Sequence, residues 1–265
     1  MAVDIDLDFQ RYIERRKGAL DAQAREGAAY SYGGDLRIKK TLDSVRPVKL
    51  AIEASVRLWK SGAREGLLNG ATKVSPDRLP KLDALVERAA KALHIPRPTL
   101  YVVPALDEVV ARTFGTDEDV DVVLDAARIE TLSDDELVFV LGQECGHIQN
   151  HHVVFITALY HLTRSANRFL QWIVKPAALA LGAWAQRAAL TADRAGLIAV
   201  RNIDTAAGAL MKLMPSPGGK DGETAKRIEA LRVFADSAYY KALTGEQGGL
   251  TQAEVDGKVG EVLSR

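Results

Sequence analysis

The stretch from Leu132 to Ile148 restricts the fold more than any other part of the sequence. Ser133 followed three residues later by Glu136 matches a capping box, in which each side chain hydrogen-bonds to the other residue's backbone at a helix start. The pattern predicts a helix beginning here and continuing through Leu137, Val140, Leu141, Glu144 and His147. This helix therefore carries a carboxyl group and an imidazole within one turn of each other.

The segments before this helix are rich in β-branched residues and predict a small sheet. Expected strands cover Thr99–Val103, Val109–Phe114 and Val120–Leu124, with a turn composition at Gly115–Asp119. Helices are expected over residues 46–64, from Ser75 as N-cap with Pro76 in the first turn, and over most of the chain after residue 148. Helices, a small mostly antiparallel sheet and further helices predict a predominantly helical α+β fold.

The composition excludes several classes of protein. The chain has 35 Lys and Arg against 35 Asp and Glu, so it lacks the cationic surplus of a general nucleic-acid binder. One cysteine excludes an intramolecular disulfide and favours the cytoplasm. The uncharged stretch Ile148–Thr163, which contains three histidines, is shorter than the about 20 residues that a spanning helix needs. We expect no transmembrane segment, with peripheral membrane contact as the alternative.

The run Gln143-Glu144-Cys145-Gly146-His147 differs at one position from the zinc-peptidase motif His-Glu-x-x-His. In that motif, residues four apart on one helical face direct two imidazoles at one metal ion. The glutamate between them takes a proton from the metal-bound water. Here glutamine stands at the first histidine position.

Several segments resemble the zinc metallopeptidases of the HtpX and CAAX-prenyl-protease type, a gluzincin family. The resemblance runs from about Pro98 to Leu243 and rests on Leu100–Val103, Leu132–Leu137, Gly146–Ile148, Trp184–Gly196 and Arg227–Leu231. It implies a zincin-like core over residues 71–245. Outside that core, residues 1–70 are expected to form an N-terminal helical region packed on it, or an arm that covers the cleft or a partner. Residues 246–265 are expected to form a tail or short helix.

When the family's functional residues are matched to this sequence one by one, the differences fall at metal-binding positions. Gln143 replaces the first histidine ligand, whereas Glu144 and His147 match the general base and the second ligand. The family's glutamate ligand lies four residues before the motif aspartate, Asp193, and corresponds to Ala189. The family's late His-Pro pair corresponds to Asp221-Gly222, and its Asn-Ala at the substrate-binding edge strand to Val110-Ala111.

These departures predict that the zinc site is lost. Catalytic zinc takes three protein ligands and a water, but an amide oxygen is a poor donor and alanine is none. We therefore expect no cofactor and interpret the chain as a non-catalytic homologue, a pseudopeptidase. Its cleft would bind a peptide or protein by strand addition, with Glu144 and His147 as vestiges and Glu144 bonded to His147 or to water.

The alternative is an active zinc metalloendopeptidase with an atypical site. His151 lies one turn beyond His147 if the helix continues, so His147, His151 and Asp193 are a conceivable ligand set with zinc as cofactor. Asp193 otherwise orients a cleft residue or caps a helix, and Cys145 points away as a small buried residue. The remaining notable side chains are expected at packing or surface positions: His94, His152, His161, Phe155, Phe169, Trp172 and Trp184.

Overall fold

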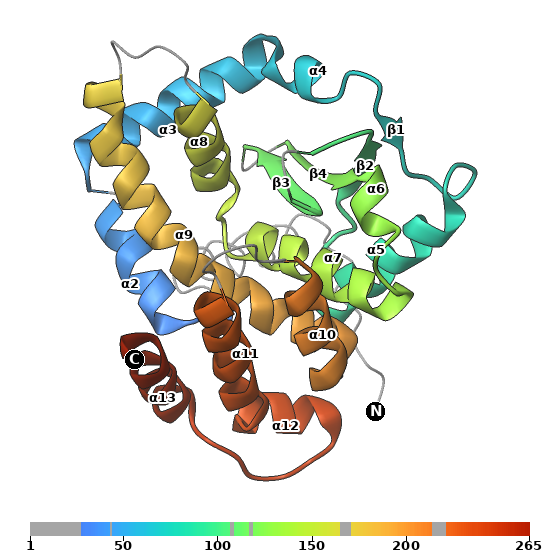
Figure 1. The fold of residues 1–265 in the computed structure, drawn as a ribbon, viewed down its shortest axis with the longest axis vertical. Helices are drawn as coiled ribbons and strands as arrows, with labels where there is room; N and C mark the ends of the chain where they lie inside the picture. The colour runs from blue at the N-terminus through green and yellow to red at the C-terminus, as the bar shows by residue number, and fades with distance from the viewer. Residues whose placement is uncertain (1–27, 43, 107–108, 117–118, 165–170, 214–220) are drawn as a thin grey trace, which may run out of the picture.

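Helices surround a four-stranded sheet in the computed structural model, which describes residues 28–42, 44–106, 109–116, 119–164, 171–213 and 221–265 (Figure 1). The first half comprises α2 (Gly33–Leu42), α3 (Arg46–Leu58), η1 (Trp59–Ala63), α4 (Arg64–Leu67), β1 (Thr72–Lys73), α5 (Pro80–Ala92), β2 (Thr99–Val103), β3 (Ala111–Gly115), β4 (Val120–Asp125) and α6 (Ala126–Ile129). The second half comprises α7 (Asp134–Gln149), α8 (Val153–Arg164), α9 (Gln171–Val200), α10 (Ile203–Leu213), α11 (Asp221–Ala235), α12 (Ala238–Thr244) and α13 (Gln252–Ser264). The expected predominantly helical α+β fold is confirmed.

The sheet has the order β1-β2-β4-β3 and leaves β3 at one edge. β2 and β4 run parallel, and the other two pairings are antiparallel. The third predicted segment forms β4 almost as expected. β3 starts two residues later than predicted, because Val109 donates its backbone N–H to Leu106 in a turn instead of extending the strand.

The predicted helix start at Ser75 is wrong. Ser75 and Arg78 exchange backbone hydrogen bonds of 2.8 and 3.0 Å, which closes a tight turn at this point. Helix α5 begins at Pro80, where a different proline occupies the first helical turn. The turn competes for the same backbone groups that a helix starting at Ser75 would need.

Helix α7 begins with the predicted capping box at Ser133 and Glu136 and packs closely on α9. Two glycines on α7 make this approach possible. A Cβ atom on Gly142 would lie 2.7 Å from the Cβ of Ala199, and one on Gly146 would collide with Ala195. Because van der Waals contact needs more than 3 Å, only glycine fits at these positions.

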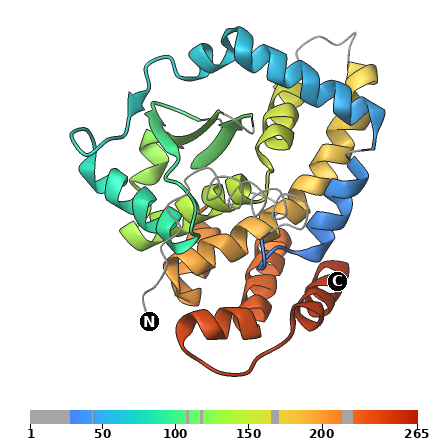
Figure 2. The same ribbon diagram turned by 180° about the vertical axis from the view of Figure 1, so that it is seen from behind.

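Both ends of the described chain lie against this helical core. Tyr30 and Tyr32 are almost fully buried, and Gly33 donates its N–H to Asp256 of α13 over 2.9 Å. Figure 2 shows α2 and α13 beside the central helices from behind. The C-terminal segment includes a full helix with its own capping box at Thr251 and Glu254. Within the described residues, no helix combines the length and apolarity needed to cross a bilayer.

Candidate functional site

A cavity of about 1040 Å³ opens between the edge strand β3 and helices α7, α8, α9 and α11. Its wall is largely apolar, with Val109, Val140, Ile156, Leu159, Trp184, Ala188 and Leu213 among the lining residues. The predicted site residues Gln143, Glu144, His147 and Ala189 all line it. The fold thus brings α7 and α9 together around one hollow.

The amide nitrogen of Gln143 is hydrogen-bonded to helix α9. Its side-chain Nε2 donates a hydrogen bond of 2.7 Å to Asp193 Oδ1. Arg227 of α11 binds the same carboxylate through Nε at 2.9 Å and Nη2 at 2.6 Å. Asp193 is 1% exposed, so this three-residue group, the Gln143 chain, is a buried polar contact between three helices.

Glu144 lies against the edge strand. The Thr113 hydroxyl donates a hydrogen bond of 2.6 Å to Glu144 Oε2, and the carboxyl group is buried. Burial raises the pKa of Glu144, although the Thr113 hydroxyl and the Arg112 charge oppose the shift. The sequence suggested His147 or water as the partner of this carboxyl, whereas its hydrogen-bond partner among the described residues is Thr113.

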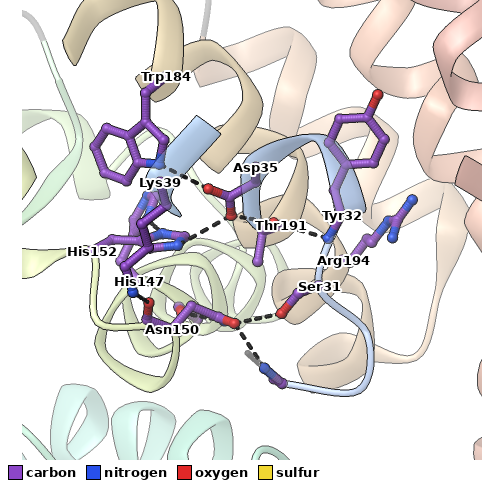
Figure 3. A network of polar contacts seen from close by, with 12 residues as sticks. Ser31, Tyr32, Asp35, Lys39, His147, Asn150, His152, Trp184, Thr191 and Arg194 are labelled. Atoms are coloured by element: carbon purple, nitrogen blue, oxygen red, sulfur yellow. Dashed lines mark hydrogen bonds and ion pairs between the residues drawn. The ribbon is translucent and has the colours of Figure 1, made fainter. Parts of the chain in front are cut away.

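His147 stands at the end of a second buried polar series, the His147 chain (Figure 3). Its Nδ1 lies 3.0 Å from His152 Nδ1, and His152 Nε2 lies 3.1 Å from Asp35 Oδ2. Asp35 also accepts hydrogen bonds from Trp184 Nε1 at 2.8 Å and Thr191 Oγ1 at 2.7 Å. Burial favours a raised pKa for Asp35, but these donors and His152 lower it, so Asp35 is a carboxylate.

The Asp35 carboxylate fixes the protonation pattern of both imidazoles. It lies 3.1 Å from His152 Nε2 and favours the proton on that nitrogen, so His152 Nδ1 is the acceptor for His147 Nδ1–H. Burial, and secondly the neighbouring His152, lower the pKa of His147 to about 3, so this ring is neutral. His147 Nε2 consequently carries a lone pair, on a side chain that lines the cavity.

Sequence reasoning missed Asp35 and placed His152 among the packing or surface residues. His152 is fully buried and bonds to both His147 and Asp35. Asp35 comes from α2, in a region where no motif was readable. The contact joins positions more than a hundred residues apart, and a single sequence carries no signal of it.

Helix α7 does not continue to His151, although the alternative ligand set requires this continuation. α7 ends at Gln149 with Asn150 as C-cap, and His151 has a left-handed backbone with φ of 54°. His151 is therefore not one helical turn beyond His147. Among the described residues, no three His, Cys, Asp or Glu side chains cluster closely enough to hold a metal ion.

The other residues singled out in the sequence lie at packing or peripheral positions. Cys145 is fully buried, and desolvation raises the pKa of its thiol to about 12, so it is unreactive. Trp184 and Phe155 pack together in a core cluster, whereas His94 is exposed and His161 partly buried. Phe169 and the side chains of Trp172 and Asp221 lie outside the described residues.

The sequence pattern of peptidase family M48 matches residues 76–240, which include the sheet from β2 onward, α7, α9 and the cavity. The chain belongs to peptidase family M48. Membership fits the order of its elements and the position of Glu144 and His147 on α7.

Relatives of this M48 member include named proteases. A protease HtpX homolog of Moorella thermoacetica is 33% identical over 100 residues, which cover 38% of this chain and 31% of the relative. The plastoglobule-localized metallopeptidase 48 of Arabidopsis thaliana is 33% identical over 145 residues, covering 53% and 42%. A protease HtpX homolog of Tropheryma whipplei is 27% identical over 125 residues, covering 46% and 42%. The chain spans less than half the length of these relatives, and no solved structure matches it significantly.

Proposed function

We propose that this chain is a non-catalytic member of family M48 whose cleft binds an extended peptide segment. The observation that carries the proposal is the donor set around the cavity. His147 offers one imidazole, the Gln143 amide is bonded to Asp193, and Ala189 offers a methyl group. This set does not fit catalytic zinc, which takes three protein ligands.

The position of Glu144 supports the same proposal. A general base in a peptidase acts on a water molecule activated by the metal. Here the carboxyl group is buried and accepts a hydrogen bond from Thr113. Without a metal, no group in the cavity supplies an acidified water for it to deprotonate.

The edge strand supports peptide binding. Asp125 N–H donates to Val110 C=O and Thr116 N–H to Asp119 C=O, so the even-numbered residues of this strand region pair with β4. The odd-numbered residues then direct their backbone groups away from β4. Gly115 donates to Thr157 of α8, which closes that end, whereas Ala111 presents its N–H and C=O beside the cavity. An added peptide strand would hydrogen-bond there.

A second candidate, an atypical metallopeptidase that uses His147, is favoured by the His147 chain. The polar series from Asp35 through His152 leaves an imidazole lone pair on a cavity residue. Such outer-shell support is what metal-binding histidines have. This candidate requires ligands beyond those found near His147 in the described residues.

Elemental analysis and a cleavage assay distinguish the two candidates. The purified protein should contain negligible zinc after dialysis against buffer with micromolar zinc, and should leave a labelled casein substrate intact. His147→Ala should change neither result. Stoichiometric zinc, together with cleavage that a chelator or His147→Ala abolishes, would overturn the non-catalytic proposal.

A further inference from the structure

We infer that the cleft selects peptides bearing a carboxylate, which pairs with Arg112 beside the edge strand. The inference rests on the proposed function, because it specifies which extended peptide the cleft accepts. It follows from the charges in the cavity wall, from the position of Arg112 on β3 and from the alternation of side chains along a strand.

The cavity wall carries an excess of cationic groups. Among the lining residues that the structure describes, Arg112, Arg128 and Arg227 stand against one acidic residue, Glu144. Arg227 is bound to Asp193. In the part of the chain that the structure describes, no acidic side chain lies within ion-pair distance of Arg112 or Arg128. Arg112 and Arg128 thus place two positive charges in the cavity wall that no described carboxylate pairs with.

The guanidinium of Arg112 is held in place by an aromatic ring. Its Cζ lies 5.8 Å from the ring centroid of Tyr160 on α8, a cation–π distance. Tyr160 in turn packs edge-on against Phe114, with centroids 4.9 Å apart. Arg112 is half-buried, so water solvates its charge incompletely. A charge-assisted hydrogen bond that Arg112 donates to a ligand carboxylate would compensate for this.

The strand geometry determines where that carboxylate must lie in the peptide. Side chains alternate between the two faces of a strand, so Arg112 points to the face opposite Thr113 and Glu144. A residue of the added strand opposite Arg112 projects on the Arg112 face, and its two neighbours project toward Glu144. The expected peptide therefore has an acidic residue flanked on both sides by uncharged apolar residues.

Binding of a positional library tests the inference. The probe is a fluorescein-labelled octapeptide library with blocked ends, measured by fluorescence polarisation. We expect enrichment of Glu or Asp at one position, with apolar neighbours. Replacing that Glu by Gln in the selected peptide should weaken binding to the unmodified protein about tenfold or more, the usual effect of losing a hydrogen bond to a charged group.

The Arg112→Gln variant separates this selectivity from general peptide binding. It should bind the Glu and Gln peptides within about twofold of each other, as expected when no charged pair forms. Arg78→Gln, an exposed arginine outside the cavity, is the matched control and should keep the full preference. Arg112→Glu should favour the peptide with Lys at the same position. Unfolding curves establish that each variant is folded.

The outcomes distinguish the inference from the proposed function. Peptide binding without an acidic preference, or a preference that Arg112→Gln leaves intact, would overturn the inference alone. Failure of all library peptides to bind would contradict the proposed function as well. A parallel library with free C-termini tests the other source of a carboxylate. Binding that depends on the free C-terminus, and not on an internal acidic residue, would contradict the inference.

Discussion

The His147 chain and the Gln143 chain are two buried polar groups that each end at a residue lining the same cavity. They have opposite effects on that residue. In the first, Asp35 and His152 orient an imidazole so that its lone pair remains available. In the second, the Asp193 carboxylate is bound by Arg227 and accepts a hydrogen bond from the Gln143 amide nitrogen. The Asp35 carboxylate thus leaves a nitrogen donor available on His147, whereas the Asp193 carboxylate binds the Gln143 side chain.

The departures from a set of three metal ligands lie at two positions of the described cavity wall. The support behind His147 has the form found behind metal-binding histidines, in which an outer carboxylate fixes the tautomer. The shortfall lies at Gln143 and Ala189, both on cavity-lining helix faces. Two substitutions should therefore be enough to test whether the helices still have the spacing of a metal site.

The largest expected effect is a gain of zinc affinity by several orders of magnitude in the double variant Gln143→His with Ala189→Glu. The two changes complete a set of three protein donors with His147. Each single change should raise affinity far less, because it leaves two donors. Competition titration with a chromophoric zinc chelator measures the constants. A folded double variant that stays free of zinc would mean that the helix spacing does not suit a metal.

The next effect is on folding. Asp35→Ala should lower the free energy of unfolding by about 3–5 kcal/mol, because it leaves buried His152, Trp184 and Thr191 donors without their acceptor. Urea denaturation followed by circular dichroism gives the value. The control Asp77→Ala removes an exposed carboxylate and should shift stability by no more than about 0.5 kcal/mol.

A smaller effect connects Asp35, at the far end of the His147 chain, with metal affinity in the cavity. Introduced into the zinc-binding double variant, Asp35→Asn should reduce zinc affinity by about 10–100-fold, the usual result of altering an outer-shell partner. The same chelator competition measures it, with Asp77→Asn as control. Equal affinity in both variants would show that the His147 chain does not act on the cavity side of the ring.

The smallest effect concerns Glu144. Its pKa is raised by burial, so the folded state binds the proton more tightly and stability falls as pH rises above 4.5, the ordinary value of glutamate. Glu144→Gln removes this dependence and keeps an acceptor for Thr113. We expect the variant to melt a few degrees higher at pH 8 and at the wild-type temperature at pH 4. Calorimetry at the two pH values checks the difference, and a gain independent of pH would contradict a charged origin.

The local features of the sequence predicted the scaffold well. The capping box at Ser133 and Glu136 and the β-branched run at Thr99–Val103 formed as expected, because short-range hydrogen bonds and backbone preferences determine them. Ser75 had an equally good local pattern for a helix start. It failed because a turn closed by Arg78 used the same backbone groups.

The site was predictable only where its residues share one helix or one motif. Glu144 and His147 were found from their spacing on α7, and Ala189 and Asp193 from a family pattern. Asp35, His152 and Thr113 were not found, because their roles come from contacts between distant segments. The end of α7 at Gln149 decided against His151, and helix ends are among the least certain features of a sequence prediction.

The close approach of α7 and α9 has a consequence for engineering this protein. Gly142 and Gly146 set the gap between the helices by lacking a side chain, and neither is among the residues that line the cavity. Alanine at either position would place a methyl group against α9. It would push the two helices apart and so widen the cavity between them. The width of the cleft can therefore be changed at two positions that do not contact a bound ligand.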